Sequence, residues 1–363
     1  MRSGFLIFGL VVALLFALYA YYRFNHILSN YDLSEKNRKI LRIAITIIFF
    51  LFSIDFTSFT GILIICTIIS LTIVDLFGLI YDFIIRNSEN KTLLRISKLR
   101  KQGIIALILL LVLMVSGVYG INHIEPTEYN ITTDKINGSY TIVFISDTHY
   151  NTNQNPELLK NEIKNINGYQ PDLVILGGDI IDDRTPPESV KEVFKELGGI
   201  NSTYGTYFVF GNHDRTGKLT DGENLTALIE KCGITILADE NKTFNDDLIL
   251  IGRNDNMFSN DTSRMTSQEL LDNIDKSKYI LLIDHQPKDS EINSRLGVDL
   301  ELSGHTHGGQ IFPMNVINNI IGTLNYGPYH FGDMTHIVSS GIAGWGWPLK
   351  NVGKAEYVII NIN

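Results

Sequence analysis

The sequence predicts an α/β domain preceded by a bundle of membrane helices, and the uneven distribution of apolar residues is the first reason. Apolar residues crowd the first third of the 363-residue chain, whereas most histidines and acidic residues follow it. In the later part, short β-branched runs alternate with helical patterns, and most runs end in Gly, Asp or His. Such alternation is typical of layered α/β folds. We therefore expect a membrane region at 1–121, a linker at 122–139 and an α/β domain at 140–363.

The charge and the cysteine content exclude some classes of protein. The formal net charge is −9, and the two cysteines are Cys66 and Cys232. Nucleic acid is not an expected partner, because proteins that bind it normally present a basic surface to phosphates. Two cysteines build neither a disulfide framework nor a thiolate metal site. Any metal must therefore be held by nitrogen and oxygen ligands.

Four apolar stretches are long enough to cross a bilayer, which takes about 20 helical residues. They are 4–22, 43–58, 61–85 and 103–121. Only a brief polar segment around Asp55 separates the second from the third, so three spans are an alternative. A cleaved signal peptide is an alternative for the first stretch, although its basic residues follow the apolar run. Asp75 has no evident basic partner, so we expect it at the membrane interface.

Basic residues indicate the orientation, because short loops rich in them stay on the cytoplasmic side. The loop after the first stretch carries Arg23, Lys36, Arg38, Lys39 and Arg42. The loop before the last stretch carries Arg86, Lys91, Arg95, Lys98, Arg100 and Lys101. With four spans, both termini lie outside the cytoplasm. We expect a multi-pass protein of the cell membrane with an extracytoplasmic catalytic domain.

The later part of the chain has room for a layered sheet structure. We expect strands at 141–146, 173–176, 207–210, 248–251, 279–283, 300–303, 336–340 and 357–360. We expect helices at 157–166, 188–197, 225–232 and 267–274. In open α/β sheets, ligands bind beyond the carboxyl ends of the strands. A functional site is therefore expected where these strands end.

Five motifs at predicted strand ends supply residues that bind metals. They are Asp147-Thr-His149, Gly178-Asp179-Ile-Ile-Asp182, Gly211-Asn212-His213-Asp214, Asp284-His285 and Gly304-His305-Thr-His307. A single Asp or His at a strand end is usually structural, but five in succession favour a metal cluster. Carboxylate, imidazole and amide oxygen without sulfur suit Mn, Fe or Zn. One shared carboxylate would hold two ions about 3.5 to 4 Å apart, as in two-metal phosphoester hydrolases.

In this order, the five motifs resemble those of the calcineurin-like metallophosphoesterase superfamily, over essentially all of 140–363. The run Gly-His-Thr-His-Gly-Gly-Gln from Gly304 more narrowly resembles bacterial membrane-associated phosphodiesterases, a group compared with UDP-2,3-diacylglucosamine hydrolases. The resemblance implies a four-layer sandwich of two mixed β-sheets flanked by helices. It also implies a metal-dependent phosphoric ester hydrolase with two divalent ions.

The resemblance assigns a role to each motif residue. It implies one metal on Asp147, His149 and His307, a second on Asn212, His285 and His305, and a bridge at Asp179. It implies that His213 is a catalytic residue that binds no metal, with Asp214 orienting it. Asp182 takes a supporting position behind the ligands.

Departures from the family pattern fall on the substrate side. Asp284 stands where Ser or Thr is usual, and Lys350 stands where Arg is usual, so Lys350 is expected to contact a phosphate oxygen as a point charge. Arg184 and Arg215 flank ligand motifs and are candidate phosphate contacts. Trp345 and Trp347 are expected either at the bilayer interface or in the core.

These patterns predict a membrane-anchored phosphoesterase in which a metal-activated water attacks phosphorus in line. The expected substrate is a phosphodiester or pyrophosphate in a lipid or a lipid-linked molecule. A nucleotide or cell-wall phosphodiester is the alternative. A non-catalytic binding module is a third hypothesis, but such a module would have lost ligands, and every ligand position is filled.

Overall fold

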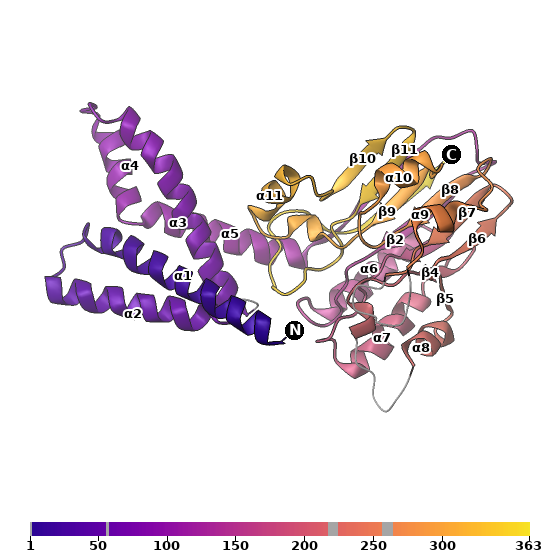
Figure 1. The fold of residues 1–363 in the computed structure, drawn as a ribbon, viewed down its shortest axis with the longest axis horizontal. Helices are drawn as coiled ribbons and strands as arrows, with labels where there is room; N and C mark the ends of the chain where they lie inside the picture. Colours follow the sequence, from indigo (N-terminus) through magenta and orange to yellow (C-terminus); the bar gives the residue numbers. More distant parts are fainter. Residues whose placement is uncertain (1, 56–57, 217–223, 256–263) are drawn as a thin grey trace. The chain divides into compact units, whose positions relative to one another are not determined.

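The computed structural model describes residues 2–55, 58–216, 224–255 and 264–363. The chain divides into two compact units, Met1–Ser116 and Gly117–Asn363. Figure 1 shows the helices of the first unit and the sheets of the second.

The first unit consists of long helices. It contains α1 (Arg2–Leu28), α2 (Glu35–Ser53), α3 (Phe59–Ile84), α4 (Lys91–Lys101) and most of α5 (Ile104–Asn122). Three segments, 9–28, 59–84 and 104–122, are long and apolar enough to cross a membrane. Three of the four expected spans therefore meet these criteria. Helix α2 does not qualify by composition, because Lys36, Arg38, Lys39 and Arg42 lie in its first turns.

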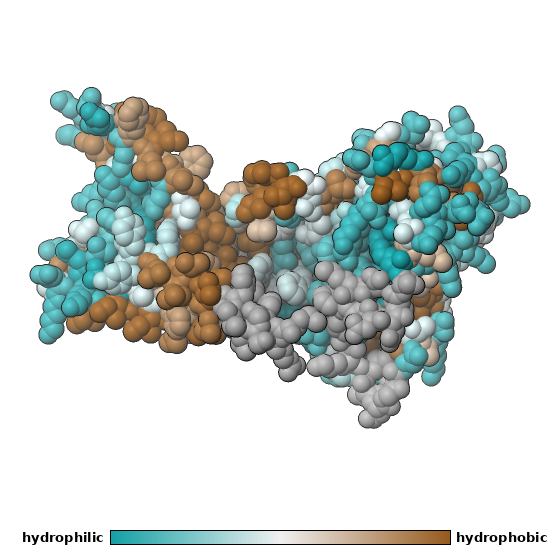
Figure 2. Space-filling view, in the orientation of Figure 1, coloured by the Kyte–Doolittle hydropathy of each residue, from teal (hydrophilic) through white to brown (hydrophobic). Residues whose placement is uncertain are grey.

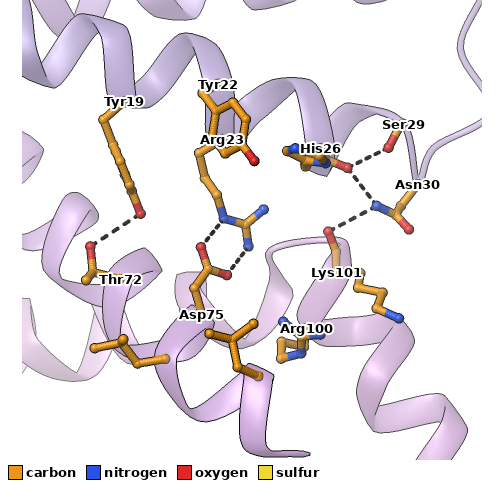
Figure 3. A pocket seen from close by; sticks show the side chains of 12 residues that line it. Tyr19, Tyr22, Arg23, His26, Ser29, Asn30, Thr72, Asp75, Arg100 and Lys101 are labelled. Atoms are coloured by element: carbon orange, nitrogen blue, oxygen red, sulfur yellow. Dashed lines mark hydrogen bonds and ion pairs between the residues drawn. The ribbon is translucent and has the colours of Figure 1, made fainter. Parts of the chain in front are cut away.

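An ion pair joins α1 to α3 within this unit. The guanidinium of Arg23 donates to both carboxylate oxygens of Asp75, at 2.5 and 2.7 Å (Figure 3). Arg23 is buried, so removing either charge would leave the other uncompensated. The expectation that Asp75 has no basic partner is therefore wrong. The two residues are 52 positions apart, and their proximity depends on how the helices pack.

The first sheet of the second unit has six strands in the order β1-β12-β2-β3-β4-β5. They are β1 (Ile124–Ile131), β12 (Ala355–Ile362), β2 (Tyr140–Ile145), β3 (Leu173–Leu176), β4 (Thr206–Phe208) and β5 (Ile234–Ile236). Neighbours are parallel except β12 and β2, which are antiparallel. Strand β1 lies in the range expected to be a linker, which is a correction. Its backbone pairs with the last strand of the chain.

The second sheet also has six strands, in the order β10-β11-β9-β8-β7-β6. They are β6 (Glu240–Phe244), β7 (Leu248–Gly252), β8 (Tyr279–Ile283), β9 (Leu300–Ser303), β10 (Gly327–Phe331) and β11 (Met334–Val338). The four central strands β11, β9, β8 and β7 are parallel, and each edge strand is antiparallel to its neighbour. Both sheets are therefore mixed, as predicted.

Helices complete the second unit. They are α6 (Pro156–Gly168), α7 (Pro187–Gly198), α8 (Leu225–Lys231), α9 (Ser267–Leu271), α10 (Ser290–Arg295) and α11 (Met314–Ile320). The helix expected at 267–274 ends at Leu271, and the sequence patterns did not predict α10 or α11. Two 3-10 turns, η1 (Asp214–Thr216) and η2 (His307–Gly309), follow β4 and β9.

Alternation along the strands creates the layers, because successive side chains point to opposite faces of a sheet. In β2, Ile142 and Phe144 pack between the two sheets. Val143 and Ile145 point the other way, into a cluster formed with α6, α7 and α8. A third cluster covers the outer face of the second sheet, where α9 packs. Each fully buried large apolar side chain contributes about 1.5 to 3 kcal/mol. The predicted sandwich of two mixed sheets flanked by helices is confirmed.

Candidate metal centre

Two groups of potential metal ligands lie beyond the strand ends. One contains Asp147, His149 and His307, and the other contains Asp179, His285 and His305. Within each group, the ligand atoms lie within 4.8 Å of one another. Parallel strands present their carboxyl ends at one edge of a sheet, so residues distant in sequence converge there. The first group contains the three residues that the family resemblance assigned to one metal, and the second contains His285 and His305 together with Asp179, to which the resemblance gave the bridging position.

Unsatisfied polar atoms indicate that this cluster fits metal ions. His149 Nε2, His285 Nε2 and Asn212 Oδ1 are buried and have no hydrogen-bond partner among the described residues. A buried polar atom left without a partner costs about 1 to 3 kcal/mol. Divalent cations bound to nitrogen and oxygen would satisfy all three atoms. The donor set therefore fits divalent ions, and Asn212 offers a further oxygen ligand.

Polar contacts behind the histidines orient their rings. His285 Nδ1 lies 2.8 Å from the carbonyl oxygen of Gly177, and His307 Nδ1 lies 3.2 Å from that of Ala343. Because a carbonyl only accepts, each Nδ1 carries the hydrogen and each Nε2 keeps its lone pair for a metal. His149 Nδ1 lies 3.2 Å from Asp182 Oδ2. Asp182 is thus placed behind a ligand, where a supporting carboxylate is expected.

The pKa values of three potential ligands favour the protonation states that metal binding requires. Burial lowers the pKa of His305 to about 4 and that of His307 to about 3, so both rings are neutral near pH 7. Burial alone would raise the pKa of Asp179, but the charges of His285 and His149 outweigh it, and the pKa falls below its usual range. Metal binding requires neutral imidazole and ionised carboxylate, and His305, His307 and Asp179 meet these conditions. Burial alone would lower the pKa of His149 and of His285, but the neighbouring carboxylates outweigh it and raise both values, so a metal would have to displace a proton from each of these two rings.

The ligand loops have an unusual backbone conformation. Positive φ angles occur at Asp147 (53°), His149 (35°), Asp179 (52°), His305 (70°) and His307 (50°). Such conformations cost about 1 to 3 kcal/mol each and cluster at functional sites. Gly178 also has a positive φ, of 87°, and a Cβ there would lie 2.5 Å from the backbone nitrogen of Gly211. Only glycine allows the two ligand loops to approach this closely.

One buried carboxylate fixes these two loops. Asp214 accepts hydrogen bonds from the backbone N–H groups of Asp179 (2.8 Å), Ile180 (2.8 Å), Ile181 (3.1 Å) and Gly211 (2.6 Å). We expected Asp214 to orient the ring of His213. These four hydrogen bonds instead give it the role of clamping the loops after β3 and β4, which supply Asp179 and Asn212.

His213 lies at the border of the metal groups. Its backbone N–H donates to Asp179 Oδ1 at 2.8 Å. Its ring centre is 5.4 Å from that of His149 and 5.3 Å from that of Trp345, on which it stacks. The ring is only partly buried. This position beside the ligands suits contact with a substrate, which keeps His213 as the candidate catalytic residue.

The two arginines expected to contact phosphate differ in their surroundings. Arg184 has a side chain 40% exposed, 3.3 Å from Asp182 beside the first ligand group. The guanidinium of Arg215 donates to Asp255 and Asn254 and lies 3.9 Å from the ring centre of Phe210. Arg184 is therefore the better candidate for contact with a substrate.

The unusual Asp284 has its own arginine partners. Its buried carboxylate pairs with Arg253, at 3.3 Å, and with Arg264. These two cations offset the cost of burying a charge beside the ligand His285. Neither arginine belongs to a motif, so the sequence patterns did not identify them.

Lys350 does not face the site, and the expectation that it contacts a phosphate is wrong. Its side chain is fully buried, and Nζ donates to the carbonyl oxygens of Ser340, Gly341 (3.0 Å) and Ala343 (3.1 Å). Burial lowers its pKa to about 7. The carbonyl of Ala343 also faces His307 Nδ1. Lys350 therefore holds the loop that orients a metal ligand.

A sandwich of two mixed sheets with paired ligand groups at the strand ends defines a metallophosphoesterase fold. The family model for calcineurin-like phosphoesterases matches residues 140–309. The chain is 30% identical over 251 residues to the uncharacterized metallophosphoesterase YkuE of Bacillus subtilis, covering 66% of this chain and 85% of that protein. The chain belongs to the calcineurin-like phosphoesterase family.

Other relatives are longer than the matching region. An uncharacterized metallophosphoesterase of Campylobacter jejuni is 31% identical over 244 residues, covering 66% of this chain and 63% of the relative. A Bos taurus protein named transmembrane protein with metallophosphoesterase domain is 29% identical over 233 residues, covering 60% of this chain and 52% of the relative. The chain thus spans somewhat less than two thirds of the Campylobacter jejuni relative.

Replacing Lys350 by Met tests whether this residue supports the loop behind His307 or binds the substrate. Lys350→Met is expected to lower metal affinity or kcat about 10- to 100-fold, as is typical when a group behind a metal ligand is lost. KM should change little. Metal content, kcat and KM on an aryl phosphodiester measure both effects, and Arg184→Met is the matched control, expected to raise KM with metals retained. Intact metal affinity with a raised KM in Lys350→Met would contradict the supporting role.

Proposed function

We propose that this chain is a membrane-anchored phosphoesterase that hydrolyses a phosphodiester or pyrophosphate bond with two divalent ions, which are Mn, Fe or Zn. The main support is the pair of potential ligand groups. Buried atoms of His149, His285 and Asn212 have no hydrogen-bond partner among the described residues, and a metal ion would supply one. When bound, such ions polarise a phosphoryl oxygen and lower the pKa of an attacking water. Asp179 is the proposed bridge, because its Oδ2 lies 3.2 Å from His285 Nε2 and 3.8 Å from His149 Nε2.

The proposed substrate is a lipid or a lipid-linked molecule. Three helices of the chain are apolar enough to cross a membrane. The last one leads directly into the second unit, Gly117–Asn363, which we call the catalytic unit. An anchor of this kind keeps the catalytic unit close to the bilayer. The motif from Gly304 to Gln310 supports the same class, since it resembles that of phosphodiesterases compared with UDP-2,3-diacylglucosamine hydrolases. A nucleotide or cell-wall diester is the alternative substrate, and the assay described next compares it with lipid substrates.

Reloading the full chain with metals tests the proposed activity. The protein in lipid nanodiscs is stripped with a chelator, reloaded with Mn, Fe or Zn, and assayed on aryl mono- and diesters, nucleotide diesters and lipid extracts. We expect two ions per chain and diester hydrolysis with at least one metal. The variant Asp179→Asn should lose both metals and activity. Two bound ions without hydrolysis of any ester would instead indicate a binding module.

His213 is proposed to stabilise charge on the phosphoryl group or to protonate the leaving oxygen. His213→Ala should retain both metals and lose about 10²- to 10⁴-fold in kcat, the usual contribution of general acid–base catalysis. An activated aryl diester should lose less than an alkyl diester, whose alkoxide leaves poorly without a proton. Metal content and kcat on both esters measure this. Loss of metal would make His213 a ligand, and equal slowing would exclude the acid role.

We propose that the catalytic unit lies outside the cytoplasm. Asn30 Nδ2 donates to the carbonyl oxygen of Lys101 at 3.3 Å (Figure 3). Tyr31 Oη donates to that of Gln102 at 2.8 Å, so the two basic loops share one end of the helical unit. An even number of crossings must then separate them. The 19 residues of α2 reach about 28 Å, which matches a hydrocarbon core of about 30 Å. Its basic side chains would extend to the headgroups. Helix α5 then leads outward.

A reporter that is active only in the cytoplasm tests this orientation. Fused after Asn363, it is expected to be silent, because basic loops stay inside. Fused to a chain that ends at Lys101, it is expected to be active. Fluorescence of intact cells, corrected for protein amount, measures both. A bright fusion after Asn363 would overturn the orientation and leave the metal chemistry untouched.

A further inference from the structure

An apolar surface on α11 has no partner within the described chain. It consists of Met314, Val316, Ile317, Ile320 and Ile321, which are exposed by 42%, 42%, 42%, 78% and 68%. We call it the α11 patch, and Figure 2 shows hydrophobic atoms over this helix. From Ile311 to Gly332 the sequence contains no Lys, Arg, Asp or Glu. Exposed apolar patches of this kind usually mark an interaction surface.

The last membrane helix ends inside the same unit as the α11 patch. The final turns of α5, from Gly117 to Asn122, belong to the catalytic unit. The backbone N–H of Lys350 donates to the carbonyl oxygen of Gly117 at 2.8 Å, and Gln154 Nε2 donates to that of Ile121 at 2.5 Å. The catalytic unit is therefore attached directly to the point where α5 would leave the bilayer.

A short chain of hydrogen bonds connects this point to α11. Asn351 follows Lys350, and its backbone N–H donates to the carbonyl oxygen of Gln310 at 2.9 Å. The Asn351 side chain accepts a hydrogen bond from the backbone N–H of Phe312 at 2.8 Å. Helix α11 begins two residues later, at Met314. These hydrogen bonds fix the α11 patch close to the end of α5, and therefore close to the point where α5 would leave a bilayer.

The α11 patch also adjoins the metal centre. The turn η2, which contains the ligand His307, packs against α11, because a Cβ at Gly309 would lie 2.5 Å from the backbone nitrogen of Asn315. The backbone N–H of Trp345 donates to Gln310 Oε1 at 3.0 Å, and its ring stacks on His213. Trp345 is 38% exposed. An indole between an apolar surface and a polar site is typical of membrane interfaces.

We infer that the α11 patch inserts into the surface of the bilayer that α5 leaves, so that His213 and the ligand groups are held at headgroup level. An apolar helix face at an interface enters about 5 to 10 Å below the headgroups. A bilayer covers an uncharged apolar surface without requiring the complementary charges of a protein partner. The inference rests on the proposed membrane placement of the catalytic unit and narrows the substrate to a phosphoester in a lipid headgroup.

Depth-dependent quenching of a fluorophore tests the insertion. The full chain carries Ile320→Cys, or Val316→Cys as a second position, with an environment-sensitive dye on the new thiol. Cys66 is buried and Cys232 partly exposed, so Cys232→Ala removes the accessible native thiol. The protein is placed in nanodiscs with or without lipids that carry a nitroxide near the headgroup or near the chain end. Lys276→Cys is the control, because this exposed residue precedes the amino end of β8, opposite the ligand loops.

Strong quenching at both patch positions by nitroxides near the headgroup, with none at position 276, is the expected result. Unchanged emission at position 320 in every nanodisc would overturn the inference. Blue-shifted emission without quenching would also overturn it, since a protein surface, such as a second copy of this chain, would then cover the patch. Hydrolysis of a soluble aryl diester is measured on the same samples. Quenching without hydrolysis would contradict the proposed activity alone, and hydrolysis without quenching would contradict the inference alone.

Discussion

The geometry of the metal centre depends on the clamp that Asp214 forms. Its two carboxylate oxygens accept four backbone N–H groups, which come from the loops after β3 and β4. These loops supply Asp179, the proposed bridge, and Asn212, the proposed amide ligand. Each such hydrogen bond contributes about 0.5 to 1.5 kcal/mol, so the four together also offset the strain of the positive φ angle at Asp179. Without it, the loops would relax toward ordinary backbone conformations and the ligands would separate.

The Asp214 clamp can fix the geometry of the ligands because their side chains are also held in place. Asp147, His149 and His285 are fully buried. Carbonyl groups lie behind the rings of His285 and His307, and the Asp182 carboxylate lies behind the ring of His149. In a dry environment an unpaired ligand atom is expensive, so the folded chain is stabilised by any cation that fits. Folding and metal binding are therefore coupled in this unit. The strain stored in the ligand loops is part of that coupling, since it persists only while the surroundings fix it.

Local patterns in the sequence were sufficient to locate the two groups of potential metal ligands. The features that these patterns did not predict depend on contacts between distant parts of the chain. Parallel strands end at one edge, so motifs such as Asp147-Thr-His149 could be placed together before their geometry was known. Strand β1 was missed because its partner β12 lies at the other end of the chain. The role of Lys350 was misread for the same reason: its motif suggests a phosphate contact, but its burial depends on packing. Helix α11 contains Asn and Ile without a capping side chain, which gave no helix signal.

Lys350 connects the end of α5 to the loop that orients the potential metal ligand His307. Its backbone N–H binds the carbonyl of Gly117 in the last turns of α5, while its Nζ binds the carbonyl of Ala343, which orients His307. Gly120 contacts the same residue so closely that a Cβ there would lie 2.1 Å from the carbonyl oxygen of Lys350. A displacement of the end of α5 would therefore shift Lys350 and, through the Ala343 carbonyl, the ring of His307. Because these contacts are short, the end of α5 belongs to the scaffold of the candidate metal centre, in addition to its proposed role as an anchor.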